Sequence, residues 1–313
     1  MTTQRPLVLL DSASLYFRAY YALPDSMTAP DGTSINAVRG FADTIARILL
    51  DRRPARLVAC LDADWRPAFR VAALPSYKAH RVADEAANAE EVPDTLSPQV
   101  PIILDLLAAA GLATAEAAGY EADDVIGTLA TRESDAPVEV ITGDRDLFQL
   151  VRETPTPVKV IYVGKGWAKA EVLGPAELAQ RYDLPEDNPG PAYADMATLR
   201  GDPSDGLPGV AGIGEKTAAK LIREFGRLEA LLPAAAKGDP RIPLRARTSL
   251  VNSAEYLAAA PGVVRVATDA PIDQPRSDVL GGGVADPDAY AELRERWGLS
   301  TSADRLAAAL DKV

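Results

Sequence analysis

The sequence is nearly devoid of the residues that build disulfides, zinc sites and histidine centres. Its 313 residues include one cysteine, Cys60, and one histidine, His80. One cysteine cannot form an internal disulfide or a cysteine-rich zinc site, and one histidine cannot form a histidine-based metal site. Any metal ion must therefore be held by oxygen ligands, which favours hard cations such as Mg²⁺ or Mn²⁺.

Long apolar runs and an apolar leader are missing too. No stretch approaches the roughly 18 uncharged apolar residues that suggest a membrane-spanning helix, so we expect no membrane partner. The first ten residues, MTTQRPLVLL, contain no basic segment followed by a long apolar one. Together with the scarcity of cysteine, this predicts a cytoplasmic protein.

A surplus of positive charge, a common signature of nucleic-acid-binding proteins, is absent. The chain has 45 acidic and 33 basic residues and a formal net charge of −12. This balance argues against DNA binding through the field of the whole protein. Divalent cations bound by clustered acids would, however, reduce the negative field that a nucleic acid meets.

What the sequence does contain is a set of short apolar runs that each end in acidic residues. Helical patterns separate them, and the alternation predicts an α/β fold with a mostly parallel central sheet flanked by helices. In such sheets, sites form beyond the carboxyl ends of the strands. The runs are residues 7–10 before Asp11, residues 57–61 before Asp62 and residues 138–142 before Asp144 and Asp146; the helical patterns are at 35–50, 100–110 and 123–132.

Three parts are predicted along the chain. Residues 1–175 form the α/β core, and residues 176–260 form a small helical subdomain. Residues 261–313 form a C-terminal segment that packs back on the core. Within the core, residues 65–98 are too long for a tight connection, so we expect a partly helical arch, or lid, over the site.

Acids also begin a helix and precede a glycine hairpin. The segment EADD contributes Glu121, Asp123 and Asp124 to a first helical turn, and GDPSD contributes Asp202 and Asp205. Each acid alone has an ordinary explanation, because Asp and Glu favour first turns for capping and for the helix dipole. Acids that follow strands are likewise common in solvated loops.

The number of these acids changes their interpretation, because nine carboxylates near one sheet edge would raise one another's pKa values unless cations compensate them. Mg²⁺ takes few direct carboxylates, so nine acids imply at least two ions. Two divalent ions roughly 3.5–4 Å apart form a known clamp for displacement at phosphorus. We expect Arg145, between two of the acids, to point away from the site. The predicted metal ligands are Asp11, Asp62, Glu121, Asp123, Asp124, Asp144, Asp146, Asp202 and Asp205.

The segment GVAGIGEKTAAKLI combines glycines with hydrogen-bond donors. Its glycines allow close backbone approach, and the helix that follows points free N–H groups at the turn, as in phosphate-binding sites. An ordinary turn between two helices is the alternative. The segment lacks the GK[ST] ending of a nucleotide-binding loop, so ATP is not implied. The predicted DNA contacts are Gly209, Gly212, Gly214, Lys216, Thr217 and Lys220.

Basic and aromatic residues elsewhere complete the set of candidates. Arg70, Lys78 and Arg81 lie in the predicted arch, from which they would offset the charge that develops on a scissile phosphate. Phe17 would stack on a base, and Arg18 would hold a phosphate. The alternatives are a solvated surface for the cations and a core position for Phe17.

With these motifs the chain resembles the bacterial 5′-3′ exonuclease and flap endonuclease family, which includes the 5′ nuclease domain of DNA polymerase I. The resemblance covers about residues 7–225 and rests on motifs in the family's order. We expect a stand-alone enzyme, because no polymerase module follows. The motifs are RAYYALP, LDAD, the spacing from Arg70 through Tyr77 and Lys78 to Arg81, GYEADD, TGDRD and GDPSDGLPGVAGIGEKTA.

The resemblance implies a structure-specific nuclease that hydrolyses DNA at free 5′ ends, nicks and 5′ flaps by two-metal-ion catalysis, in Okazaki fragment processing and in repair. It implies that the nine acids hold Mg²⁺ or Mn²⁺ and that a helix-hairpin-helix-like subdomain binds duplex DNA, with backbone carbonyls that hold K⁺. The alternatives are an RNA-directed 5′ nuclease, which would accept RNA–DNA hybrids, and a non-catalytic protein that binds branched DNA. We expect a monomer.

Two positions depart from the family pattern. Relatives commonly have glycine after the first aspartate and asparagine after the second acid of the later pair, where this chain has Ser12 and Gly206. Neither change removes a ligand. Gly206 does, however, put the rigidity of its loop and a supporting hydrogen bond in question.

Overall fold

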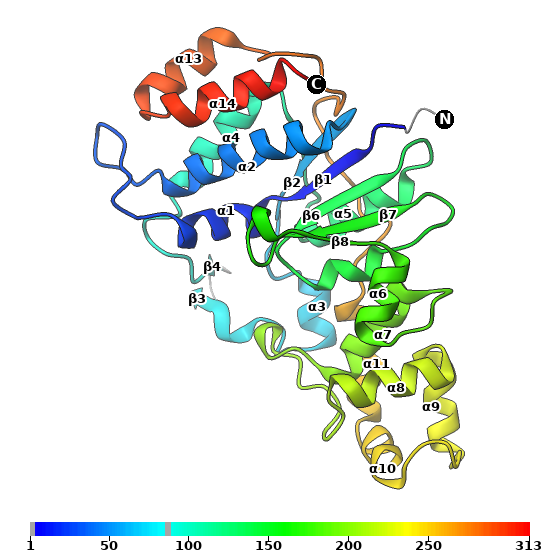
Figure 1. Ribbon diagram of the computed structural model, residues 1–313. Coiled ribbons are helices and arrows are strands. Elements are labelled where there is room, and N and C mark those ends of the chain that lie inside the picture. Colours follow the sequence, from blue (N-terminus) through cyan, green and yellow to red (C-terminus); the bar gives the residue numbers. More distant parts are fainter. Residues whose placement is uncertain (1–3, 85–88) are drawn as a thin grey trace.

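The computed structural model, which describes residues 4–84 and 89–313, is built around one six-stranded sheet (Figure 1). The strand order is β5-β2-β1-β6-β7-β8, and every pairing is parallel except that of β7 with β8. The predicted α/β fold with a mostly parallel sheet is therefore confirmed. The strands are β1 (Leu7–Asp11), β2 (Arg56–Cys60), β5 (Ala113–Ala115), β6 (Val138–Thr142), β7 (Val158–Tyr162) and β8 (Glu171–Leu173).

Both faces of the sheet are buried, which explains why its strands are continuous apolar runs. Successive side chains of a strand point to opposite faces. In β1, Leu7 and Leu9 belong to one core, and Val8 and Leu10 belong to the other. The second core is covered by helices at the top of Figure 1, which are α1 (Ser12–Ala22), α2 (Asn36–Arg52), α4 (Gln99–Ala110), α13 (Pro287–Arg296) and α14 (Ser300–Leu310).

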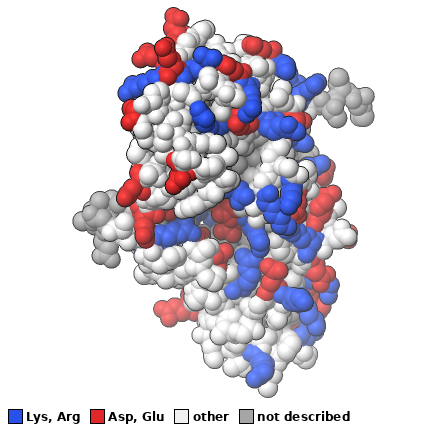
Figure 2. All heavy atoms as spheres, turned by 60° about the vertical axis from the view of Figure 1, so that its left-hand side comes forward, with Lys and Arg blue, Asp and Glu red and all other residues white. Residues whose placement is uncertain are grey.

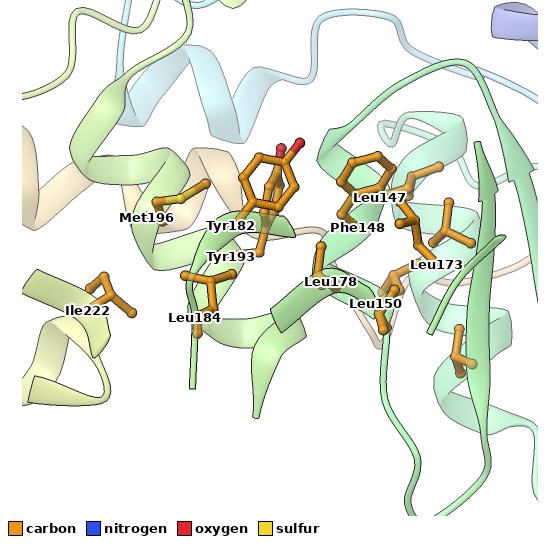
Figure 3. Packing of buried hydrophobic residues seen from close by; sticks show 14 of the residues in the cluster. Leu147, Phe148, Leu150, Leu173, Leu178, Tyr182, Leu184, Tyr193, Met196 and Ile222 are labelled. Atoms are coloured by element: carbon orange, nitrogen blue, oxygen red, sulfur yellow. The ribbon is translucent and has the colours of Figure 1, made fainter. Parts of the chain in front are cut away.

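The first core continues from the sheet into a group of helices below it. Phe148, Tyr182 and Tyr193 pack where the two meet (Figure 3), with ring centroids 5.4 Å apart for Phe148 and Tyr193. Ile222 of α8 belongs to the same core. The helices on this side are α5 (Ala122–Arg132), α6 (Pro175–Tyr182), α7 (Pro189–Arg200), α8 (Glu215–Phe225), α9 (Leu228–Ala236), α10 (Leu244–Asn252), α11 (Ala254–Ala259) and α12 (Pro261–Val264).

The stretch 65–98, predicted as a partly helical arch, contains short elements in its described residues, 65–84 and 89–98. Its helix α3 (Ala68–Ala73) stops before Leu74. Leu74 precedes Pro75, and the residue before a proline is disfavoured in a helix. A 3₁₀ turn at Ala79–Arg81 and the antiparallel pair β3 (Val82–Asp84) and β4 (Ala89–Glu90) follow. Residues 85–88 of the predicted arch lie outside the described residues. We call residues 68–81 the arch base.

The predicted long helices agree closely with the structure, since α2, α4 and α5 each lie within two residues of the predicted bounds. Helix α1 and strand β7 lie outside the predicted set. Strand β7 does show the alternation of a strand, because Val158 and Val160 are buried while Lys159 is exposed. None of the helices in the described ranges is both long and apolar enough to cross a membrane.

The junction of sheet and helices in Figure 3 generates a stability prediction. Replacing Phe148, which is fully buried, by alanine should lower the free energy of unfolding by about 3–5 kcal/mol, because a large cavity would remain. Tyr21→Ala is the control, since Tyr21 is 72% exposed and its loss should change stability by less than about 1 kcal/mol. Urea denaturation of both variants measures this difference, and equal losses would contradict the assignment of Phe148 to the core.

Candidate active site

The carboxyl ends of three neighbouring strands open into a cavity of about 920 Å³. Strands β2, β1 and β6 lie side by side and run parallel, so the acids that follow them meet at one edge of the sheet. Figure 2 shows a hollow across the middle of the molecule in which acidic and basic side chains meet. Seven of the nine predicted metal ligands line the cavity: Asp11, Asp62, Glu121, Asp123, Asp144, Asp146 and Asp202.

Hydrogen bonds hold the strand-end acids in place. The carboxylate of Asp11 accepts from the Thr142 hydroxyl at 2.6 Å and from the Ser14 N–H at 3.2 Å, so it joins β1 to β6 and caps α1. The carboxylate of Asp62 accepts from the Ala122 N–H at 2.7 Å. This second bond fixes the start of α5 against the end of β2.

Burial makes these acids hard to ionise without a countercharge. Desolvation raises the pKa of Asp11 to about 7, the Thr142 hydrogen bond opposes that rise, and the charges of Asp144 and Asp62 add to it. Desolvation and neighbouring carboxylates also raise the pKa values of Asp123 and Asp146 well above the usual range. The cavity wall therefore favours binding of positive charge.

The donor set fits hard divalent cations, because it consists of carboxylate oxygens on a polar, open wall. Within residues 4–84 and 89–313, no three acidic, histidine or cysteine side chains already form a ligand cage. In this part of the chain the carboxylates therefore stand farther apart than the direct ligands of one ion. Ions held partly through water would bridge this separation.

Asp124 and Asp205 do not line the main cavity. Asp124 is fully buried, and Arg70 binds both of its oxygens at 2.7 Å while the Ala267 N–H donates to it at 2.7 Å. Asp124 therefore lies behind the wall. Asp205 faces a smaller adjoining cavity of about 90 Å³ and accepts from Arg81 Nη2 at 2.9 Å.

The structure does not support the predicted contact of Arg70 with a phosphate. Its side chain is buried at 2% exposure and donates to Glu121, Asp124 and the Val263 carbonyl, the last at 3.0 Å. Moving it toward a substrate would leave two buried carboxylates without their cation, which is costly. Arg70 instead fastens the arch base to α5 and to α12.

Lys78 and Arg81 do line the main cavity, where they neutralise acids. The Lys78 ammonium is paired with Glu121, and its backbone N–H donates to the Asp205 carbonyl at 3.0 Å. Burial works against the charge on Lys78, but the carboxylates of Glu121 and Asp205 outweigh it and raise its pKa. The arch base thus supplies positive charge to the acidic wall.

Phe17 and Arg18 lie on the opposite wall, on α1. Arg18 Nη2 donates to the Gly164 carbonyl at 2.6 Å, which holds the guanidinium at the mouth of the cavity. Phe17 is half-buried and stacks against Tyr16 with ring centroids 5.5 Å apart. Both side chains are open to a ligand in the cavity.

The glycine hairpin lies outside the cavity, except that Glu215 at the start of α8 reaches its wall. Gly214 caps α8, and Gly209 and Gly212 have the left-handed φ values of 67° and 78° that favour glycine. The remaining predicted contacts project from the exposed face of α8: Lys216, Thr217 and Lys220.

The cavity is also lined by residues that the sequence analysis does not select, among them Arg145, Tyr162 and Arg200. Arg145 lies in the cavity wall, but its side chain is hydrogen-bonded to Tyr162, which agrees with the expectation that it points away from its neighbouring acids. The sequence did offer a signal for two of these residues: Arg145 lies between two candidate acids, and Arg200 directly precedes GDPSD. Tyr162 ends β7, a strand outside the predicted set, so no signal pointed to it.

Comparison with known proteins places these features in context. Residues 6–183 match the family model described as 5′-3′ exonuclease, N-terminal resolvase-like domain, and residues 189–284 match that of the 5′-3′ exonuclease, C-terminal SAM fold. The chain is 54% identical over 311 residues to a 5′-3′ exonuclease of Mycobacterium tuberculosis, with 98% of each chain covered. It is 41% identical to DNA polymerase I of Mycobacterium bovis over 72% of this chain, which spans 24% of that protein.

Among solved structures, a bacteriophage T5 flap endonuclease in a complex with DNA and metal ions superposes with a TM-score of 0.62. The match covers 98% of this chain and 100% of the other, at 18% sequence identity. Identity this low carries information on the fold alone. It agrees with the mostly parallel sheet and the flanking helices.

The two departures from the family pattern have different structural settings. Gly206 has a φ of 72°, and a Cβ there would lie 2.1 Å from the Ser76 carbonyl oxygen of the arch base. Asp202 and Leu207 exchange backbone hydrogen bonds of 2.9 and 2.8 Å, which closes the loop and keeps it rigid without an asparagine. The Ser12 hydroxyl is buried and forms no hydrogen bond to any described residue.

The close approach of Gly206 to the arch base generates a prediction that compares two glycine substitutions. Gly206→Ala and Gly212→Ala both place a side chain at positive φ, which costs about 1 kcal/mol. Only Gly206→Ala also meets a backbone oxygen, whereas nothing lies within 4 Å of a Cβ at Gly212. Thermal unfolding should therefore show a larger loss of stability for Gly206→Ala. Equal melting temperatures would contradict the contact.

Proposed function

The chain belongs to the 5′-3′ exonuclease family, and from that membership we propose that it hydrolyses DNA at free 5′ ends, nicks and 5′ flaps. The observation that carries the proposal is the convergence of seven of the predicted carboxylate ligands with Arg18, Lys78 and Arg81 in one open cavity. The acids suit divalent cations, and the basic side chains suit a phosphate. Both are needed to hydrolyse a phosphodiester.

We propose Mg²⁺ or Mn²⁺ as the cations, held by Asp11, Asp123 and Asp146 together with the other acids of the cavity. When bound, such ions lower the pKa of an attacking water and offset charge on the phosphoryl oxygens. Asp11 is buried and Asp123 and Asp146 are half-buried, and desolvation together with mutual repulsion disfavours their charged forms. Asp124 would act from behind the wall, where it holds Arg70 and the start of α5.

Lys78 and Arg81 would change partners when substrate enters. In the structure they neutralise Glu121 and Asp205. Cations bound by those acids would leave the two side chains available to the scissile phosphate, whose developing charge they would offset. Arg18, anchored on the Gly164 carbonyl, would orient a phosphate from the opposite wall.

The hairpin and α8 would bind the duplex part of the substrate. Lys216, Thr217 and Lys220 are exposed beside the N-terminus of α8, where free N–H groups favour phosphate. By resemblance to the family we also propose K⁺ at the hairpin carbonyls. Relationship to DNA polymerase I supports a role in replication, including Okazaki fragment processing, and in repair.

Cleavage of a labelled 5′-flap DNA tests the proposal. Wild-type protein should cut it in Mg²⁺ or Mn²⁺ and not in excess chelator, because the acids alone supply no electrophile. Asp146→Asn should lower kcat at least about 10- to 100-fold, since one charged oxygen of the wall is lost. Robust cutting in chelator would refute the metal requirement, and a preference for an RNA flap would favour the RNA-directed alternative.

Metal binding has a readout that does not require cleavage. Mg²⁺ or Mn²⁺ should raise the melting temperature of the DNA-free protein, because ions that bind only the folded state stabilise it. The rise should be smaller for Asp146→Asn. Equal rises would mean that the ions bind away from Asp146.

Duplex binding by α8 generates a separate prediction. Lys216→Ala should weaken binding of a flap DNA in chelator and reduce the slope of log K against log salt by about one, because one phosphate contact is lost. Lys312→Ala is the control, since Lys312 is an exposed lysine near the C-terminus and lies outside the hairpin and α8. A slope unchanged by Lys216→Ala would remove Lys216 from the duplex contact.

A further inference from the structure

Arg200, the last residue of α7, faces both the acidic wall and the hairpin. Its side chain is 19% exposed and lines the main cavity as well as the small adjoining one. Nη1 lies 3.2 Å from a carboxylate oxygen of Glu215, the first residue of α8. Nη2 lies 3.8 Å from a carboxylate oxygen of Asp202. One guanidinium therefore stands between the acidic loop and the hairpin helix.

The backbone around Arg200 is closely packed against the backbone of the hairpin. A Cβ at Gly201 would lie 2.5 Å from the Gly209 nitrogen, and a Cβ at Gly209 would lie 2.3 Å from the Arg200 carbonyl oxygen. The Val210 N–H donates to the Leu199 carbonyl at 2.9 Å. The end of α7 thus touches the hairpin backbone directly, so that movement of one is passed to the other.

The chemistry of arginine suits this position. A guanidinium presents several donors in a fixed plane and can serve two carboxylates at once, whereas an ammonium is a single point charge. Asp202 Oδ1 accepts from Ser204, whereas Oδ2 lies 3.8 Å from Arg200, too far for a hydrogen bond, and so can bind a cation. The closer contact of Arg200 with Glu215 joins α7 to α8. The Glu215 side chain is 47% exposed, so the ion pair contributes little to stability, and its effect is to limit the direction in which α8 can shift relative to α7.

We propose that Arg200 is a positioning residue that couples the duplex-binding hairpin to the acidic site and so determines which phosphodiester is cut. The inference rests on the proposed function. In this arrangement the Arg200–Glu215 pair keeps α8 at a constant distance from Asp202 and its neighbours. Without the pair, a duplex held by α8 would present more than one phosphodiester to the same acids.

The test maps the cut on an end-labelled 5′-flap DNA at single-nucleotide resolution. Arg200→Gln should spread cleavage over several positions and lower kcat about 10- to 100-fold, since small misplacements of reacting groups cost that much. Its affinity for the flap in chelator should change less than about threefold, because Lys216 and Lys220 remain. Arg200→Lys, which keeps the charge without the planar fork, should restore kcat only in part.

Two further variants separate positioning from other roles. Glu215→Gln should spread the cuts in the same way, and the double variant should add little to either single one. Arg223→Gln is the control, because Arg223 is an arginine of α8 that pairs with Asp183, and it does not line the main cavity. It should cut as the wild type does. Melting temperatures verify that each variant is folded.

The outcomes are distinguishable. Wild-type cleavage together with an unchanged cut position in Arg200→Gln would overturn the inference and leave the proposed function intact. Loss of rate in Arg200→Gln with a normal pattern in Glu215→Gln would also overturn it, because Arg200 would then act on the phosphate and not through the hairpin. A wild-type protein that does not cut the flap would refute the proposed function and the inference together.

Discussion

Repulsion between the carboxylates at the carboxyl edge of the sheet is the constraint on which the rest of the structure depends. Strand order brings Asp11, Asp62 and Asp144 together, and burial of Asp11 together with the charges of the other two makes this edge costly for negative charge. The chain compensates with cations from outside the sheet. Lys78 and Arg81 come from the arch base. Countercharge is therefore what holds the arch base over the cavity.

Basic side chains neutralise the carboxylates both behind the cavity wall and at its surface. Behind the wall, Arg70 is bound permanently between Glu121 and Asp124, and this buried group makes α5 and the arch base one unit. At the wall, Lys78 and Arg81 are closer to solvent and have partners that cations would also bind. Buried pairs cannot exchange partners cheaply, whereas those at a cavity wall can. The structure thus separates cations that support the site from cations available to a substrate.

Much of the site could be predicted from short-range patterns. Acids placed directly after buried strands must meet at one edge once the strands pair in parallel, and this accounts for Asp11, Asp62 and Asp144. Other roles depended on contacts between distant segments. Asp124 looks like a ligand in the sequence, but its partner Ala267 lies 143 residues away. The capping pattern accounts for its contact with the Glu121 N–H, but no local pattern predicts its contacts with Arg70 and Ala267.

The sequence by itself determined the α/β fold, the family and the kinds of side chain at the site, because periodicity and motif order are properties of neighbouring residues. Only the tertiary structure decided which of those side chains face the cavity. Arg70 turned inward and Arg200 turned toward Glu215 because carboxylates from other segments lie there. The physical reason is that charge pairing is satisfied in three dimensions, and its partners are chosen by packing, not by distance along the chain.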